Sequence, residues 1–214
     1  MSAGPLNKLI CLFSKSERLF QQANRCEDAG NHSEALRLRK ECYEYCLEKK
    51  GKDNKSTLVS LMNLALSYHS VGDIEKSFEL KKMCYEDCVR YLGEKDALTI
   101  SSLSNLALEY SAKGDNEEAL ELSKKCYELG KETLGEEHQY TLTYLMNLAF
   151  CYAKTSDRQT ATKMMGRCYN LRLRELGEDH PDTVRAKKNY DILLKCENLK
   201  KEYYDLGINR TEVL

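Results

Sequence analysis

The chain has 214 residues, with 33 Lys and Arg against 34 Asp and Glu, and this balance removes the electrostatic case for binding nucleic acid or an anionic membrane surface. No stretch approaches the roughly 18 consecutive apolar residues that a membrane-spanning helix needs, and no secretory cleavage site follows the N-terminal apolar residues. The sequence therefore predicts a soluble, cytoplasmic protein with no nucleic-acid partner and no membrane partner.

The first predicted element is residues 1–15, an N-terminal helical extension that caps the first repeat. From residue 16 onward the chain repeats itself with a period of 42 residues. Three series of identical residues mark this period: Gly51, Gly93, Gly135 and Gly177; Cys42, Cys84, Cys126 and Cys168; and Asn63, Asn105, Asn147 and Asn189. A fixed period of this length is typical of stacked repeats, in which each unit buries its apolar face against its neighbours.

Residues 54–95 show how one repeat is built. Apolar residues between Leu58 and Tyr68 follow the spacing of one buried helix face, and Asn54 can cap that helix. Gly72 suits a left-handed helix end, and the following Asp73 suits the N-cap of a second helix. The pattern predicts an antiparallel pair, whose members we call helix A and helix B.

The same pattern divides the rest of the chain. The predicted segments are repeats 16–53, 54–95, 96–137 and 138–179, a partial fifth repeat with a capping helix at 180–206, and a flexible tail at 207–214. The spacings Asn31 to Glu34 and Asp115 to Glu118 predict reciprocal capping pairs at the start of two B helices, and Pro181 suits the first turn of the last A helix. Small residues recur where the helices are expected to touch: Ala23, Ala65, Ala107 and Ala149 on the A helices, and Ala35, Ser77, Ala119 and Ala161 on the B helices.

The pattern Leu61-x-Asn63-Leu64-Ala65-x-x-Tyr68-x-x-x-Gly72-Asp73 resembles a tetratricopeptide repeat. The 42-residue period, the Asn-Leu-Ala triplets and the segment from Leu176 to Asp182 make the chain similar to the kinesin light chain type of that family. The resemblance covers residues 16 to about 194. It implies an all-α, right-handed superhelical solenoid of antiparallel helix pairs, with a concave face lined mainly by A helices.

The A helices supply the candidate ligand-binding residues. Asn63, Asn105, Asn147 and Asn189, with Gln21 in the first repeat, form a predicted ladder of carboxamides. Each carboxamide carries hydrogen-bond donors and an acceptor, so a ladder can pair with the backbone of an extended peptide whatever its sequence. An asparagine at this position can equally bond a neighbouring helix, and the sequence leaves both interpretations open.

Further candidates surround the ladder. They are Phe20, Met62, Leu66, Ser101, Ser104, Leu108, Thr143, Met146 and Phe150, with Arg185 and Lys188 at a basic end. Apolar side chains on this face are predicted to form pockets for ligand side chains. Leu66, Leu108 and Phe150 have an alternative interpretation as part of the core between repeats.

Two pairs of cysteines are candidates for metal or redox chemistry. Cys42 with Cys46, and Cys84 with Cys88, lie one helical turn apart and could offer thiolates to a metal or redox partner. Because the four histidines show no matching spacing, packing as small buried side chains is the favoured interpretation. No phosphate-binding loop, nucleophile elbow or histidine pair is present. The sequence predicts no catalytic residues, no cofactor and no metal site.

We therefore expect a protein–protein interaction module that binds an extended peptide or an unstructured protein segment in its concave groove, as a monomer or a weak homo-oligomer. One alternative is an assembly scaffold that binds a folded partner, or itself, through its convex or end faces. A second alternative is a peptide-sensing regulator.

Overall fold

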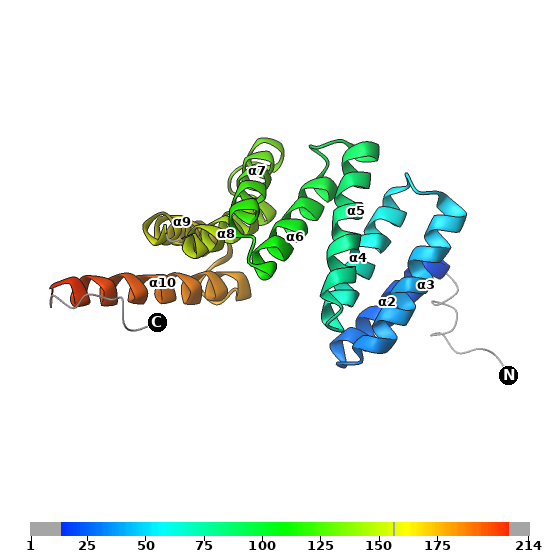
Figure 1. Cartoon of the computed structure of the whole chain (residues 1–214), viewed down its shortest axis with the longest axis horizontal. Coiled ribbons are helices and arrows are strands. Elements are labelled where there is room, and N and C mark those ends of the chain that lie inside the picture. The colour runs from blue at the N-terminus through cyan, green and yellow to red at the C-terminus, as the bar shows by residue number, and fades with distance from the viewer. Residues whose placement is uncertain (1–13, 156, 206–214) are drawn as a thin grey trace. The chain divides into compact units, whose positions relative to one another are not determined.

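The computed structural model describes residues 14–155 and 157–205, and every described element is an α-helix. The helices follow one another along the chain in Figure 1 as α2 (Lys15–Asp28), α3 (His32–Lys50), α4 (Lys55–Ser70), α5 (Ile74–Leu92), α6 (Ala97–Lys113), α7 (Asn116–Leu134), α8 (Gln139–Lys154), α9 (Arg158–Leu176) and α10 (Pro181–Asp205). The extension predicted at 1–15 lies outside the described residues except for Ser14 and Lys15, and the tail predicted at 207–214 lies wholly outside them.

Consecutive helices pack as antiparallel pairs. Helix α2 packs on α3, α4 on α5, and α8 on α9, and these are three of the predicted A and B pairs. Neighbouring repeats also touch, because α3 packs on α4, α7 on α8, and α9 on α10. The prediction of an all-α protein made of antiparallel helix pairs is confirmed.

The helices form two compact units, Met1–Ser102 and Leu103–Leu214. The division falls within α6. Within the described residues, no helix combines the length and the apolar character that crossing a membrane requires.

Glycines with positive φ end the helices, as the sequence predicts. Gly51 follows the last turn of α3 with φ of 84°, and Gly72 lies between α4 and α5 with φ of 85°. An L-residue other than glycine is strained in this left-handed region, so these positions define where a helix stops. The glycines at 93, 135 and 177 have the same role after the other B helices.

The N-caps of the B helices match the prediction only in part. The side chains of Asn31, Asp73 and Asp157 each accept a hydrogen bond from the backbone N–H three residues later. Asp115 makes no side-chain cap hydrogen bond, so the capping pair predicted between Asp115 and Glu118 is wrong. The backbone differs at this point, because the N–H of Asn116 turns back to the carbonyl oxygen of Gly114 at 2.8 Å. A full reciprocal capping box forms instead between Ser14 and Glu17 at the start of α2.

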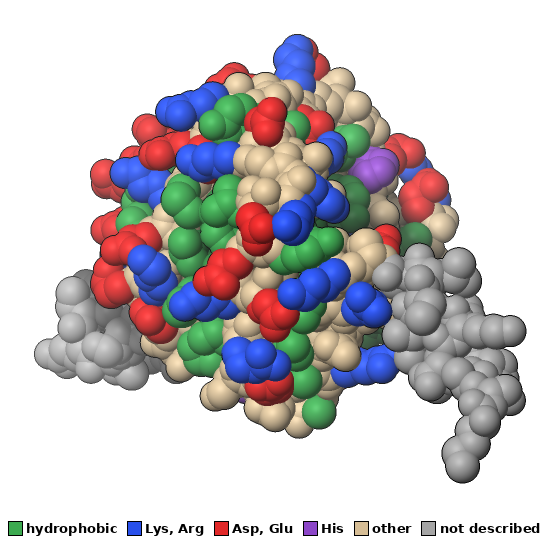
Figure 2. Space-filling model, turned by 90° about the vertical axis from the view of Figure 1, so that its right-hand side faces the viewer, with side chains coloured by type: hydrophobic (Ala, Val, Ile, Leu, Met, Phe, Trp, Pro, Cys, Tyr) green, Lys and Arg blue, Asp and Glu red, His purple; other side chains and the backbone are tan. Residues whose placement is uncertain are grey.

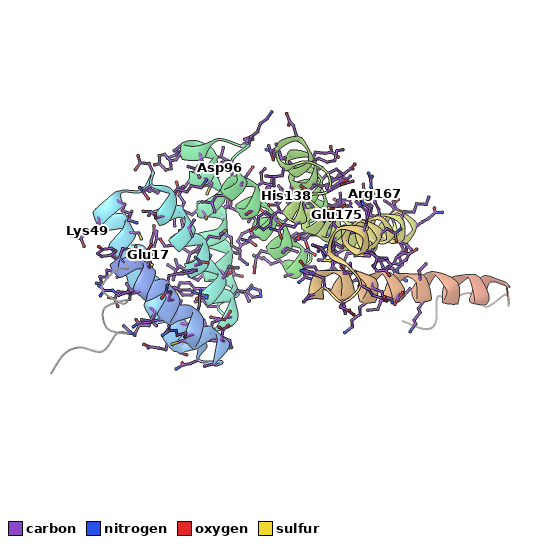
Figure 3. The ribbon with its side chains drawn as sticks, turned by 180° about the vertical axis from the view of Figure 1, so that it is seen from behind. Glu17, Lys49, Asp96, His138, Arg167 and Glu175 are labelled. Carbon is purple, nitrogen blue, oxygen red and sulfur yellow. The ribbon has the colours of Figure 1, made fainter. Side chains whose placement is uncertain are left out.

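The A helices have caps of their own, again at intervals of 42 residues. Asn54 accepts from the N–H of Ser56, and Asp96 accepts from that of Leu98 at 2.8 Å. His138 and His180 fill the same position, and the Nδ1 of each accepts a backbone N–H at 3.2 Å (Asp96 and His138 are labelled in Figure 3). The capping role of His138 and His180 was not predicted, because the histidines were considered only as metal ligands. The 42-residue period was a sufficient signal for it. Pro181 begins α10, as predicted.

The core consists of the small and aliphatic residues that recur with the period. The eight small residues named above at the helix contacts are at most 1% exposed. Three of the four repeat-position cysteines also make the same polar contact: the thiols of Cys42, Cys84 and Cys168 donate to A-helix carbonyl oxygens of Ser16, Leu58 and Leu142 at 3.5, 3.7 and 3.3 Å. The same thiol-to-carbonyl contact therefore ties helix B to helix A in different repeats.

Candidate functional site

Exposed apolar side chains recur at one equivalent position of the A helices, one in the first unit and three in the second. Leu66 is 36% exposed, Leu108 42%, Phe150 38% and Ile192 51%. We call these four residues the apolar row. Leu66, Leu108 and Phe150 are thus partly buried and partly in solvent, and their role in binding a ligand stays a prediction. Ile192, 42 residues after Phe150, was not among the predicted residues.

The predicted asparagine ladder lies one helical turn before the apolar row, and all four asparagines are half-buried. In the second unit the Nδ2 of Asn147 donates to Ser104 Oγ at 3.1 Å, and that of Asn189 donates to Met146 Sδ at 3.6 Å. Each bond braces two successive A helices. A carboxamide has two N–H hydrogens and an acceptor oxygen, so this bracing uses only part of its hydrogen-bonding capacity.

The other predicted residues differ in how much surface they present. Phe20 is 39% exposed, and Gln21, Arg185 and Lys188 are exposed. Met62, Ser101 and Thr143 are half-buried. Ser104 and Met146 are only 8% and 6% exposed, so they lie under the surface and support the asparagines.

Charges of both signs lie close together on the surface. Figure 2, which views the molecule from the side of α2 and α3, shows basic and acidic side chains interspersed with hydrophobic ones. Arg185, predicted at a basic end, donates to the carboxylate of Asp182 at 2.6 Å, which partly neutralises it. Lys187 lies 3.5 Å from Glu178, in a second ion pair at the start of the same helix.

The first unit contains a pocket of about 490 Å³ between α2, α3 and α4. The buried Cys42 and Cys46 lie at its floor, and Phe20, Val59 and Asn63 line its walls. The exposed Glu17, Lys50 and Lys55 lie at its rim. Two of the predicted binding residues, Phe20 and Asn63, are thus brought together at one concavity.

The second unit has a wider hollow of about 1140 Å³ at its helix turns. Tyr110, Tyr152 and the acidic Asp115 and Glu118 line it, and none of the predicted binding residues does so. The larger volume of this hollow is therefore no reason to place the peptide site there.

The thiols of Cys42, Cys126 and Cys168 are held in their neutral form. Burial raises the pKa of Cys42 to about 11 and that of Cys126 to about 12, and burial also raises the pKa of Cys168. A neutral thiol is a weak nucleophile and a poor metal ligand. Among the described residues, no group of three or more His, Cys, Asp or Glu side chains is arranged to hold a metal ion.

Stacked antiparallel helix pairs with a 42-residue period define a helical-repeat protein. The profile of the tetratricopeptide repeat family matches residues 56–132 and 98–174, which together cover more than half of the chain. The chain belongs to the tetratricopeptide repeat family. No protein among the curated sequences matches it significantly.

Solved structures extend the likeness to kinesin light chain-like repeats. Two structures of kinesin light chain TPR-like repeats from Podosopora anserina, one of them a variant, share 22% identity with this chain, with TM-scores of 0.74 for the variant and 0.73 for the other. Each alignment covers 90% of this chain and 92% of the other. BtubC (BKLC) from P. vanneervenii gives a TM-score of 0.74 at 20% identity, over 85% of this chain and 72% of that one. At such identities the likeness shows the fold alone.

Proposed function

We propose that this protein binds an extended segment of a partner polypeptide along the exposed face of its A helices. Membership of the tetratricopeptide repeat family makes it a protein–protein interaction module. The apolar row is the observation that supports the finer statement, because four large side chains keep 36 to 51% of their surface in water at corresponding positions. Water-exposed apolar side chains that follow a regular pattern are typical of an interaction surface.

The half-buried asparagines supply the polar part of the proposed contact. They lie one turn from the apolar row on the same side of each A helix, so a ligand backbone beside them would bring its side chains to Leu108 or Phe150. An unstructured ligand must be ordered when it binds. The affinity is therefore expected to be micromolar, about 8 kcal/mol.

The experiment uses the full chain and a synthetic peptide library displayed on an array. Replacing Phe150 or Leu108 by Ser is expected to lower the affinity for the captured peptides about tenfold, since each change removes roughly 1.5 kcal/mol of apolar contact. Each side chain buries more than half of its surface, so each change should also cost about 1 to 2 kcal/mol of stability, and binding is compared on the folded protein.

Val184→Ser is the matched control. Val184 is 52% exposed on α10 but does not belong to the apolar row, so this variant should keep full peptide binding. If Phe150→Ser and Leu108→Ser bind every captured peptide as well as the native chain, the proposed surface is wrong.

Val184 also favours a second candidate function. It occupies the position of Leu142, which is 2% exposed, yet it faces water on the last described helix. Such a helix face suits association with a second copy or with a folded partner. Sedimentation over a concentration series tests this function: self-association that Val184→Ser removes would support the scaffold.

A further inference from the structure

The wide hollow at the helix turns of the second unit is lined by side chains different from those of the proposed peptide surface. It has a volume of about 1140 Å³ and lies between the α6–α7 turn and the residues at the end of α8 and the start of α9. All of its lining residues belong to the second unit. Since none of the predicted binding residues lines it, a ligand of this hollow would be separate from a peptide on the A-helix face.

Acidic side chains predominate around the hollow. Four of its lining residues are acidic and exposed: Asp115, Glu117, Glu118 and Asp157. Lys154 is the one cation among the lining residues that the structure describes, and its Nζ donates to the carbonyl oxygen of Ser111 at 2.8 Å. The lining therefore carries four negative charges against one positive charge, which suits a cationic ligand.

Three of these carboxylates are left free by the protein itself. Asp157 caps α9 by accepting the N–H of Thr160 at 3.1 Å, whereas Asp115 makes no side-chain cap bond. Over residues 14–155 and 157–205, Asp115, Glu117 and Glu118 form no ion pair. Like charges that lie close together repel one another, so a cation bound among these carboxylates would remove that repulsion.

The acidic turn occurs in the third repeat alone. The equivalent residues of the other repeats are Asn31, Ser33 and Glu34, then Asp73, Glu75 and Lys76, and finally Asp157, Gln159 and Thr160. All of these turns join a helix A to a helix B, so the turn itself does not require three acidic residues. The concentration of charge therefore indicates a role beyond the fold.

Two tyrosines, 42 residues apart, supply aromatic surface to the hollow. Tyr110 and Tyr152 are half-buried near the ends of α6 and α8. The electron-rich face of such a ring attracts a cation. The ammonium group of Lys124, which is not a lining residue, lies 5.4 Å from the centre of the Tyr152 ring. The chain itself thus shows that this ring can receive a cation.

A buried hydrogen-bond acceptor adds a further requirement. Asn116 also lines the hollow, and its Oδ1 is buried with no hydrogen-bond partner in the described part of the chain. Because buried polar atoms are nearly always hydrogen-bonded, this oxygen lacks a donor. A suitable ligand therefore combines positive charge, N–H groups and a flat surface for a tyrosine ring. The guanidinium of arginine has all three, with five N–H donors on a planar cation.

We propose that this hollow binds a basic segment of a partner protein, with an arginine side chain against Tyr152 and its charge among the carboxylates of Asp115, Glu117 and Glu118. The volume suits a segment of several residues, because it exceeds the roughly 300 to 1,000 Å³ of a small-molecule pocket. The site lies apart from the apolar row, and the proposal does not depend on the proposed function.

The test follows two short peptides by NMR titration of the full, isotope-labelled chain. One is tri-arginine blocked at both ends, and the other is the same peptide with citrulline, which keeps the shape of arginine but carries no charge. Tri-arginine is expected to shift the backbone signals of Gly114 to Glu118 and of Tyr152, with a Kd in the millimolar range or below. The citrulline peptide should bind at least about fivefold more weakly. Equal binding of the two peptides would overturn the proposal.

A matched pair of charge variants tests the position of the site. Glu118→Gln removes a carboxylate from the hollow, and Glu128→Gln removes one from the same helix about 15 Å further along. The Kd for tri-arginine should rise about fivefold in the first variant and less than about twofold in the second. Equal effects would show a general attraction to an acidic helix and would contradict a defined site.

Tyr152→Leu tests the aromatic contact while all the carboxylates stay in place. Leu194 occupies the equivalent position of the last repeat, so the helix accepts this side chain. The Kd for tri-arginine should rise about threefold to fivefold. An unchanged Kd would refute the contact with the ring. Should this variant not fold, Asp115→Asn decides instead: it disturbs no cap bond, and an unchanged Kd in it would refute the role of the free carboxylate.

The variants of the apolar row separate this inference from the proposed function. Phe150→Ser should leave the titration with tri-arginine unchanged, and Glu118→Gln should leave unchanged the array peptides whose capture depends on Phe150. If Phe150→Ser weakens tri-arginine as much as Tyr152→Leu does, the separate site is wrong. If tri-arginine still binds at the hollow when no array peptide depends on Phe150, the basic-segment site stands and the proposed peptide surface does not.

Discussion

Asp96 shows how one residue can serve local structure and long-range contact together. Its carboxylate caps α6 through the N–H of Leu98 and holds Lys55 from the start of α4 at 2.9 and 3.1 Å. Burial by itself would raise the pKa of Asp96, but the hydrogen bonds from Lys55 and Leu98 outweigh it, so the pKa is lowered. The charged form is therefore favoured in the folded chain.

A pH dependence follows from this shift. An acid whose pKa is lowered on folding adds stability above its unfolded pKa of about 3.9, and this contribution is lost as the pH falls through the folded pKa. Asp96→Asn keeps a capping side chain but removes the charge. The native chain should be more stable than this variant near neutral pH by about 0.5 kcal/mol, a value suited to a partly exposed pair.

The measurement is urea unfolding of both proteins over a pH series. The difference between them should shrink as the pH falls below about 4. A difference that stays constant, or grows with acidity, would contradict the assignment of charge to Asp96.

At the scale of elements, the A helices are joined by the asparagines of the ladder. Asn147 and Asn189 each bond a residue of the preceding A helix, so bracing is an observed role and ligand binding a proposed one. Bracing requires a partner side chain on the preceding A helix, whereas ligand binding requires only the carboxamide itself. Ser104 is required for the brace that Asn147 makes, but it is 8% exposed and offers little surface to a ligand.

Asn147→Ala and Ser104→Ala therefore form a matched pair. Both remove the brace and should cost about 0.5 to 1.5 kcal/mol in the free energy of unfolding. Only Asn147→Ala removes the carboxamide, and it should weaken an array-selected peptide about tenfold beyond Ser104→Ala. Equal peptide affinity in the two variants would leave bracing as the whole role of the ladder at this repeat.

The B helices carry the variation that distinguishes one repeat from the next. Cys46, Gly130 and Arg172 share a position but leave, respectively, an open pocket, a site for a tyrosine ring and a buried guanidinium. A regular backbone can thus present a different interior at each junction.

For the molecule as a whole, a stacked array couples each repeat mainly to its neighbours. Arg172 links α8, α9 and α10, since it bonds Thr143 and the backbone at Asp182. Arg172→Ala should cost about 2 to 5 kcal/mol, because it opens a cavity and removes the hydrogen bonds that the buried guanidinium donates. The loss of stability should be confined to the helices that Arg172 links.

Native-state hydrogen exchange measures this locality. Exchange should accelerate in α8 to α10 and remain unchanged in α2 to α5, which belong to the other compact unit. Faster exchange spread evenly over both units would show that the chain unfolds as a single cooperative body. Arg174→Ala, a change at an exposed arginine two residues away, serves as the control.

The sequence by itself determined the helix pairs, the turns and the family, because these depend on periodic apolar residues, glycines with positive φ and capping side chains that act within a few residues. It also indicated the A-helix face as the ligand-binding surface, which stays a prediction. Local pattern was insufficient at Asp115, where the backbone turns differently, and at Gly130, whose partner Tyr144 comes from another helix. Which junction stays open depends on how side chains from three helices share one volume, and only the tertiary structure decided that.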